Sequence, residues 1–349
     1  MDGFGSYQTH FKFPLSVLAL VYGARIRACD LVSLSEIYSR NLNNGSFYMV
    51  FAMQSPAWFT SLITQESQQQ TIQVDNAHIR FQTWGNRNRQ AILFVHGHAA
   101  HSHWWDFIAP FFSDEYDVAA IDLSGNGDSD HRSQYTAVNF AREILAVAEK
   151  LGDNTIIVGH SFGGMMTRVA AFLTLSDHQS SQKGHLGGII LVDSLIPLEK
   201  NRRSALPIPK AKSRYYPDIE TGMLRFRLKP PQKCQHKFLI EHIAKHSLAF
   251  GVQGYSFKLD HALFAKMVDD PRIDLPSGID MIKDLTVPVG FIYGKKSIFF
   301  QGEQEKLLQS MIKPQYLVPI PDAAHHVFLD QPRLFCRELK CLLERILSN

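Results

Sequence analysis

The chain has 349 residues, of which 45% are hydrophobic, and its formal net charge at pH 7 is +3. This length and composition are those of a globular protein with one large or two small domains, and so small a charge gives no support for a nucleic-acid partner or for binding to a membrane surface. The four cysteines, Cys29, Cys234, Cys336 and Cys341, form neither a metal-binding pattern nor a disulfide framework, which predicts a reducing, cytoplasmic location and no metal site.

Residues 1–70 differ from the rest of the chain and carry no recognisable chemistry. Their apolar stretch at 13–22 is too short to cross a bilayer, so no integral membrane span is expected. A signal peptide is disfavoured because arginines follow this stretch where small residues would be needed for cleavage. The polar run at 65–70 is interpreted as a linker or loop. We therefore predict an N-terminal extension of unknown role over 1–70, although a true start at Met49 or Met53 would explain this segment equally well.

A regular pattern begins at Thr71. Two alternating segments, 71–74 and 78–84, flank Asp75-Asn76 and predict a β-hairpin. Helix-length segments at 138–151 and 303–312 lie between short apolar runs. The runs typical of strands buried on both faces are 91–95, 118–121, 155–158, 188–192, 287–293 and 316–320. This alternation predicts an α/β fold with a mostly parallel sheet that helices cover on both faces.

The alternation is interrupted once, over residues 197–285, which contain eight prolines and a predicted helix at 238–250. We interpret this segment as a lid or cap inserted over the carboxyl edge of the sheet, between core segments 71–196 and 286–349. Nine Lys or Arg residues stand against three acids between Pro197 and Pro230. A solvated basic face is the favoured explanation, and attraction of an acidic or phosphopantetheine-bearing acyl substrate, or of an anionic lipid surface, is the alternative. The aromatic residues expected to line an acyl pocket include Trp105, Tyr215, Phe226 and Phe257.

The most informative motif is Gly159-His-Ser161-Phe-Gly163, between an apolar run and a stretch able to form a helix. This is the G-x-S-x-G nucleophile elbow in its strand-to-helix context. The two glycines leave room for a sharp turn, and the serine hydroxyl then projects from that turn. Free N–H groups at the start of the helix favour an oxyanion. The motif predicts Ser161 as a nucleophile.

An oxyanion hole is predicted from two backbone N–H groups. In elbow hydrolases one donor follows the nucleophile and the other lies in the first strand-to-helix loop. By position these are Phe162 and His98, which follows His96-Gly97 at the end of the 91–95 strand. The turn from Asp122 to Ser129 also follows a strand, but its glycines are given a structural role, and Asp122 precedes the nucleophile in a fold whose acid comes after it.

A base and an acid must follow the serine. His325-His326 come after the last predicted strand, and either imidazole could take the serine proton. The loop after the 287–293 strand reads Gly294-Lys-Lys-Ser297 and offers no carboxylate. Asp193 stands at the end of the preceding strand, on the same edge as the elbow, and is the predicted acid. Asp322 and Asp280 are lesser candidates.

Together these motifs resemble the α/β-hydrolase superfamily, in particular its pimeloyl-ACP methyl ester carboxylesterase-like and epoxide-hydrolase-like branch, over residues 71–349. In relatives the catalytic histidine stands five residues before an acid and seven before a proline, which here are Asp330 and Pro332, so the resemblance implies His325 as the base. Asn126 stands where relatives often have histidine. Ser297 stands where many have the acid, which favours relatives that use the preceding strand and hence Asp193.

The resulting prediction is a cofactor-free serine hydrolase for a small or medium carboxylic ester, with Ser161, His325 and Asp193 as its triad. A serine at 161 argues against epoxide-hydrolase chemistry, because similar enzymes of that type have an aspartate there. Hydrolysis of a carbon–carbon bond or acyl transfer by the same triad is the alternative reaction. A receptor of the hydrolase fold that binds a ligand with little turnover is the alternative outside enzymes. The expected partner is a small acyl ester, and the oligomeric state is left open.

Overall fold

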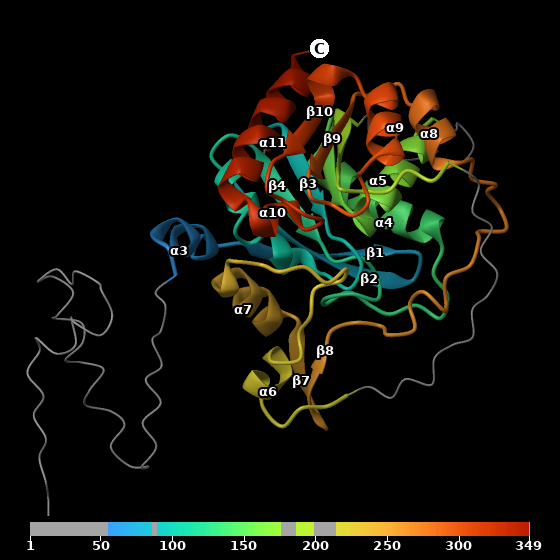
Figure 1. The fold of residues 1–349 in the computed structure, drawn as a ribbon. Coiled ribbons are helices and arrows are strands. Elements are labelled where there is room, and N and C mark those ends of the chain that lie inside the picture. The colour runs from blue at the N-terminus through green and yellow to red at the C-terminus, as the bar shows by residue number, and fades with distance from the viewer. Residues whose placement is uncertain (1–54, 86–88, 176–185, 199–213, 349) are drawn as a thin grey trace, which may run out of the picture. The chain divides into compact units, whose positions relative to one another are not determined.

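The computed structural model describes residues 55–85, 89–175, 186–198 and 214–348, and its central element is an eight-stranded sheet with the order β1-β2-β4-β3-β5-β6-β9-β10 (Figure 1). Strand β2 runs antiparallel to its neighbours β1 and β4, and the other pairs are parallel. The strands of this sheet are β1 (Gln68–Val74), β2 (Ala77–Trp84), β3 (Ala91–Val95), β4 (Asp117–Ile121), β5 (Ile156–His160), β6 (Gly188–Val192), β9 (Val289–Gly294) and β10 (Leu317–Ile320). The predicted mostly parallel sheet is confirmed.

Helices cover both faces of this sheet, with α4, α5 and α8 on one face and α11 on the other (Figure 1). Every residue of β3, β4, β5 and β6 is buried, as expected for apolar runs that are covered twice. The helices are α3 (Ala57–Ile63), α4 (Ala137–Leu151), α5 (Phe162–Leu173), α6 (Ile219–Met223), α7 (Lys237–His246), α8 (Gly278–Asp284), α9 (Glu303–Met311), α10 (Val327–Asp330) and α11 (Pro332–Leu347), with short 3₁₀ helices η2 (Ser102–Trp105), η3 (Ala109–Phe112) and η4 (Pro314–Tyr316).

The predicted hairpin is present, but its first strand begins earlier than expected. Residues 68–70, assigned to a linker, belong to β1 and pair with β2. Main-chain pairing at an edge strand needs no apolar side chains, so a polar run can form such a strand. The preceding helix α3 buries Phe59 against Phe107 and Phe238, and residues from Ser55 onward belong to one compact unit. The predictions for residues 1–54 lie outside the described part of the chain.

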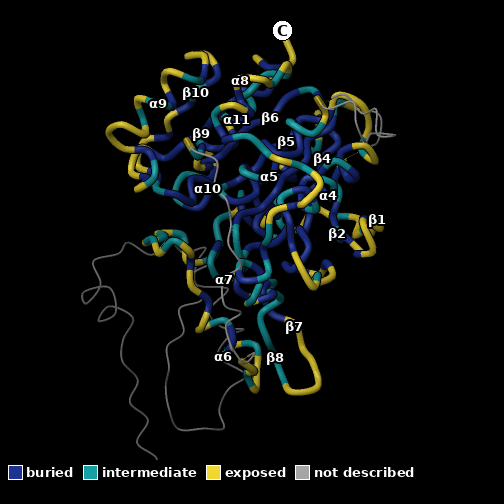
Figure 2. Tube along the Cα trace, turned by 90° about the vertical axis from the view of Figure 1, so that its right-hand side faces the viewer, coloured by how far each residue is buried: buried dark blue, intermediate teal, exposed yellow. Residues whose placement is uncertain are grey.

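The insertion after β6 contributes α6, α7 and a separate two-stranded hairpin, β7 (Leu248–Gly251) and β8 (Gly254–Phe257), which lie together below the sheet in Figure 1. In Figure 2 the tip of this hairpin is exposed. The helix expected over 238–250 ends at His246, because Leu248 to Gly251 pair with β8 across a glycine-containing turn. Residues 199–213 lie outside the described part. The role of the insertion as a lid stays a prediction.

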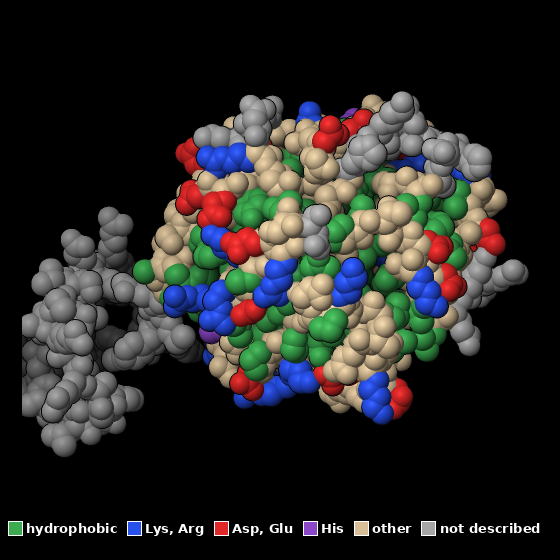
Figure 3. All heavy atoms as spheres, turned by 90° about the horizontal axis from the view of Figure 1, so that it is seen from above, with side chains coloured by type: hydrophobic (Ala, Val, Ile, Leu, Met, Phe, Trp, Pro, Cys, Tyr) green, Lys and Arg blue, Asp and Glu red, His purple; other side chains and the backbone are tan. Residues whose placement is uncertain are grey.

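The molecular surface carries both signs of charge. On the face seen in Figure 3, Lys and Arg side chains are interspersed with Asp and Glu. Within the described residues no helix is both long enough and apolar enough to cross a membrane. Cys234, Cys336 and Cys341 are free thiols, while Cys29 lies outside the described part. The cytoplasmic location stays a prediction.

Candidate active site

Ser161 occupies the sharp turn between β5 and α5, with a φ of +52° that L-residues rarely adopt. The flanking glycines are required by close packing. A Cβ on Gly163 would lie 2.2 Å from the backbone oxygen of His96, and one on Gly159 would lie 2.4 Å from Oγ1 of Thr167. The turn can therefore form only because both flanking residues lack a side chain, as the two glycines of the motif predict.

Two hydrogen bonds hold the strained turn in place. The Ser161 N–H donates to the backbone oxygen of Val192 (2.9 Å), and the hydroxyl of Ser194 donates to the backbone oxygen of Ser161 (2.8 Å). Val192 ends β6, so the neighbouring strand fixes the backbone of the serine. Ser194 was not singled out from the sequence, because nothing in its local pattern indicates this contact.

The structure brings Ser161, His325 and Asp193 into one hydrogen-bonded chain. Nε2 of His325 lies 2.9 Å from Oγ of Ser161, and Nδ1 lies 2.7 Å from Oδ1 of Asp193. Because a carboxylate only accepts, Nδ1 carries the proton, and Nε2 is left with a lone pair for the serine hydroxyl. His325 and Asp193 are 3% and 1% exposed, so this chain of contacts is shielded from water.

The Asp193 carboxylate is surrounded by donors. Besides His325, the N–H of Gly294 donates to Oδ2 (2.9 Å) and the hydroxyl of Ser297 donates to Oδ1 (2.7 Å). Burial raises the pKa of Asp193, and the hydrogen bonds from His325, Gly294 and Ser297 act in the opposite direction by stabilising the charged form. Ser297, noted in the sequence only as a missing acid, is therefore a direct partner of the acid on the neighbouring strand.

The alternative candidates for the base and the acid are not part of this hydrogen-bonded chain. Both ring nitrogens of His326 are buried without a hydrogen-bond partner in the described structure, and burial lowers its pKa to about 3. Asp322 forms an exposed ion pair with Lys296 (2.7 Å). Asp280 accepts a hydrogen bond from Ser277 in the first turn of α8 (2.6 Å). His326, Asp322 and Asp280 therefore form no hydrogen bond with Ser161 or His325 among these contacts.

The two predicted oxyanion donors lie beside the serine. Phe162 is the first residue of α5, so its N–H has no acceptor within the helix. The loop after β3 passes against the nucleophile, since a Cβ on Gly97 would lie 3.3 Å from Cβ of Ser161. The ring of the next residue, His98, lies 6.5 Å from the ring of Phe162. Burial, assisted by the positive charge of Lys229, lowers the pKa of His98 to about 4, so its imidazole is neutral at pH 7.

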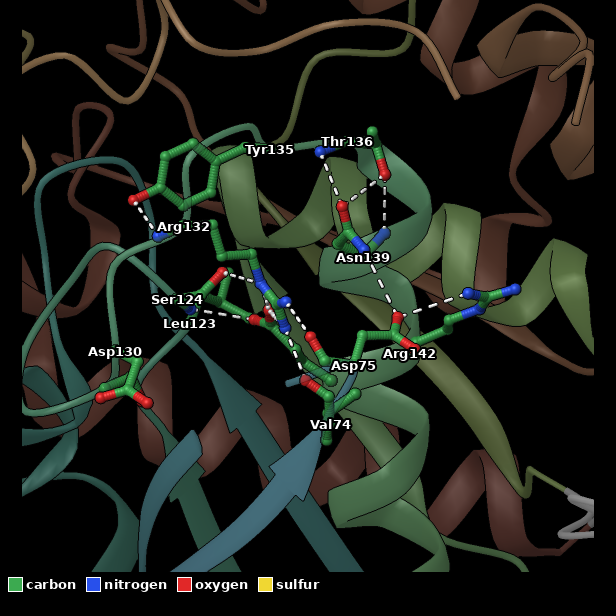
Figure 4. Close-up of polar contacts among 12 residues, drawn as sticks. Val74, Asp75, Leu123, Ser124, Asp130, Arg132, Tyr135, Thr136, Asn139 and Arg142 are labelled. Atoms are coloured by element: carbon green, nitrogen blue, oxygen red, sulfur yellow. Dashed lines mark hydrogen bonds and ion pairs between the residues drawn. The ribbon is translucent and has the colours of Figure 1, made fainter. Parts of the chain in front are cut away.

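The glycine turn after β4 has the structural role expected of it. The Asp122 carboxylate accepts hydrogen bonds from the N–H groups of Ser102 (2.6 Å) and Asp128 (2.8 Å), which tie this turn to the loop after β3. Arg132 extends the network by donating to the buried carboxylate of Glu143 (3.0 Å) and to the end of β1 (Figure 4). These contacts fix the loops beside the serine without supplying a reacting group.

A cavity of about 350 Å³ is lined by residues of the loop after β3, among them His98, and by residues of the insertion. Ser161 and His325 are not part of its lining. Phe226 and Phe257 line it, and their role in binding substrate stays a prediction. The basic side chains that line it are Arg214, Arg225, Arg227, Lys229 and Lys258. Of the nine basic residues noted between Pro197 and Pro230, the first five lie outside the described part, and the other four are all in this wall.

Two of the expected pocket residues do not line this cavity. Trp105 is fully buried, with its ring 4.8 Å from that of Phe94 and 4.6 Å from that of Phe328, so it belongs to the core, and the prediction that it binds substrate is wrong. Its neighbour Trp104 lines the cavity instead. Tyr215 is 46% exposed and is likewise replaced by its neighbour, Tyr216, in the cavity wall.

The chain matches the family model described as "Alpha/beta hydrolase family" over residues 92–338. The similar curated proteins include the uncharacterized hydrolase YugF of Bacillus subtilis, 31% identical over 28% of this chain and 37% of its own length. Human epoxide hydrolase 4 is 28% identical over 29% of each chain. A non-heme chloroperoxidase of Burkholderia pyrrocinia is 31% identical over 42% of this chain and 57% of its own. The match therefore spans about a third of the first two relatives.

Solved structures give the same fold over a longer span. A thioesterase domain from the curacin biosynthetic pathway superposes with a TM-score of 0.62 at 20% identity, covering 79% of this chain and 99% of that one. E-2-(acetamidomethylene)succinate hydrolase superposes with a TM-score of 0.63 at 17% identity, covering 80% and 100%. At such identities the likeness shows the fold alone.

Proposed function

Because this chain belongs to the α/β-hydrolase family, we propose that it is a serine hydrolase that cleaves a small or medium carboxylic ester through an acyl-enzyme intermediate. The observation that carries the proposal is the chain of hydrogen bonds from Ser161 through His325 to Asp193, with donor–acceptor distances of 2.9 and 2.7 Å. Such a chain is the arrangement that activates a serine hydroxyl, and its order along the sequence, serine, acid, histidine, is that of elbow hydrolases.

In the proposed acylation step, Oγ of Ser161 attacks the ester carbonyl carbon while its proton moves to Nε2 of His325. Asp193 holds the imidazole in the required orientation and stabilises the imidazolium that forms. The N–H groups of His98 and Phe162 would stabilise the oxyanion, and removing one such donor costs roughly 3 kcal/mol of barrier in other hydrolases. The tetrahedral intermediate then collapses, and His325 gives its proton to the departing alkoxide.

In the proposed deacylation step, His325 takes a proton from water as the water oxygen attacks the acyl carbon. A second tetrahedral intermediate collapses to release the carboxylic acid, and the proton returns to Oγ of Ser161. His325 carries the proton in both steps, and the reaction needs no redox partner because ester hydrolysis changes no oxidation state. The same triad would support acyl transfer if an alcohol or amine replaced water as the acceptor.

The cavity beside His98 supports a preference within the ester class. Its aromatic side chains suit a short or medium acyl chain, and its size is in the range of small-molecule sites. Four exposed basic side chains in its wall, from Arg214 to Lys229, favour a substrate that also carries negative charge. A series of p-nitrophenyl esters that vary in length and in a terminal carboxylate would measure both preferences.

The proposal is tested by labelling the protein with a fluorophosphonate probe. The wild type and a Ser310→Ala control, which changes an exposed serine of α9, should label to one equivalent and hydrolyse p-nitrophenyl butyrate. Ser161→Ala should do neither. Full esterase activity in Ser161→Ala would overturn the mechanism, and absence of labelling in the folded wild type would favour a ligand receptor.

A further inference from the structure

Arg168 is a buried arginine that pairs with no carboxylate of the described residues. It lies on α5, the helix that begins after Ser161, and is 3% exposed. Nη1 donates to the backbone oxygen of Leu195 (3.2 Å), and Nε has no hydrogen-bond partner in the described structure. Burial lowers the pKa of Arg168 to about 10, which leaves it charged at pH 7. Arginine is almost never fully buried unless its charge is paired, so this position lacks a counter-ion.

The guanidinium of Arg168 lines a cavity of about 370 Å³ between α5 and the start of α8. A Cβ on Gly278, at the first position of α8, would lie 3.0 Å from Cζ of Arg168, so the glycine leaves room for the guanidinium. The volume suits a small amphipathic molecule. The apolar side chains of the wall include Met165, Met166, Val169, Met267, Leu275 and Met281. Methionines adapt their shape to ligands, so this wall can accept an alkyl chain.

Three acids also line this cavity, and none of them shifts the pKa of Arg168. Asp270 forms an ion pair with Arg272 (2.7 Å). Asp269 and Asp274 each have a partner of their own, and no carboxylate contributes to the pKa of Arg168. The wall of the cavity therefore holds apolar side chains, three acids and one buried guanidinium whose pKa no carboxylate shifts.

We propose that this cavity is a binding site for an amphipathic carboxylate, such as a medium-chain fatty acid, whose head group pairs with Arg168 and whose chain lies among the methionines. A carboxylate matches the planar donors of a guanidinium, and it would supply the missing counter-charge. This cavity shares no lining residue with the cavity that contains His98, and neither Ser161 nor His325 lines it, so the site is distinct from the proposed acyl pocket. The ligand would nevertheless contact the nucleophile helix, because Met165, Met166 and Val169 of the cavity wall belong to α5.

Isothermal titration of the full, untagged chain with octanoate and with 1-octanol tests the proposal. Octanoate should bind once per chain, at least about thirtyfold more tightly than the alcohol, because only the anion compensates the buried charge. Arg168→Met keeps the apolar shape but removes the charge and should abolish the preference. The control is Arg337→Met, which removes an arginine of α11 that is paired with Glu338 (2.9 Å) and does not line the cavity, and it should leave octanoate affinity within about twofold.

Three results would overturn the proposal. The first is the absence of saturable octanoate binding to the wild type, a comparison that does not depend on any variant folding. The second is an unchanged octanoate preference in Arg168→Met. The third is loss of octanoate binding after the protein has reacted with a fluorophosphonate, which would assign the ligand to the acyl pocket.

Discussion

Replacing Asp193 by asparagine isolates the acid of the proposed triad with almost no change in shape. The carboxylate accepts three hydrogen bonds, two at Oδ1 from His325 and Ser297 and one at Oδ2 from Gly294. An amide has one oxygen and one NH₂ group. Placing the NH₂ at Oδ2 would set it against the backbone N–H of Gly294, so the favoured arrangement places it at Oδ1, facing His325.

In that arrangement the amide donates to Nδ1 of His325, which must then be the unprotonated nitrogen. The proton moves to Nε2, which can no longer accept the hydroxyl proton of Ser161. The imidazolium that forms during attack also loses its counter-charge. The corresponding substitution in a serine protease lowers kcat roughly 10⁴-fold for this reason, which corresponds to about 5.4 kcal/mol of barrier. KM should stay within about threefold, because the Asp193 side chain is buried away from substrate.

The assay is steady-state hydrolysis of p-nitrophenyl butyrate, together with the rate of fluorophosphonate labelling, which reports activation of Ser161 independently of deacylation. The matched control is Asp322→Asn, which changes the exposed acid that forms an ion pair with Lys296 and should leave kcat within about twofold. A kcat for Asp193→Asn within tenfold of the wild type would refute the reasoning. If Asp322→Asn were the variant that lost activity, the acid would lie after β10 instead.

Two further predictions concern the surroundings of the triad. Ser297→Ala removes a donor to the buried Asp193 carboxylate. Urea unfolding should show that the free energy of unfolding falls by about 1.5–3 kcal/mol, and kcat should also fall. The control Ser310→Ala should change neither quantity, and equal stability of the two variants would contradict the contact. His326 is buried and neutral, with a folded-state pKa of about 3 against an ordinary value of 6.5. Its contribution to stability is therefore present above pH 6.5 and is lost as the pH falls toward 3, by about 2 kcal/mol between pH 6.5 and 5. Urea unfolding at pH 7 and pH 5 should show this loss and a smaller one in His326→Leu; an equal loss in both proteins would place the titrating group elsewhere.

The sequence predicts the sheet and the elbow at Ser161 because both follow from local patterns, whereas the predictions of His325 and Asp193 rest on residue order and on the family resemblance. An apolar run buried on both faces specifies a central strand wherever it occurs, and G-x-S-x-G needs its glycines for steric reasons that are local to the turn. Boundaries were harder to predict where pairing overrides composition. The glutamines at 68–70 join β1 through their backbone, and Leu248 to Phe250 leave α7 to pair with β8.

The residues around the candidate site were less predictable, because neighbouring positions in a sequence point to different surroundings. Trp104 and Trp105 are indistinguishable in the sequence, yet one lines the cavity and the other packs against Phe94 in the core. Tyr215 and Tyr216 differ in the same way, because Tyr216 bridges to the β7–β8 hairpin. Contacts between distant segments decide which of two adjacent residues lines the cavity, and the periodicity of the sequence does not show these contacts.

The position of the acid follows from the topology of the sheet. Strands β6 and β9 are parallel neighbours, with Val192 opposite Ile292, so the residues that follow each strand emerge side by side at one edge. The Asp193 N–H donates to the backbone oxygen of Ile292 (2.8 Å), and the Ser297 hydroxyl then reaches the Asp193 carboxylate. An acid after either strand could therefore approach the same imidazole nitrogen. The serine at 297 keeps a donor where a second carboxylate would repel Asp193, since two buried like charges at this distance cannot both stay ionised. A single acid after β6 with a hydroxyl after β9 is thus a self-consistent arrangement, and it accounts for a serine in the loop where many relatives have the acid.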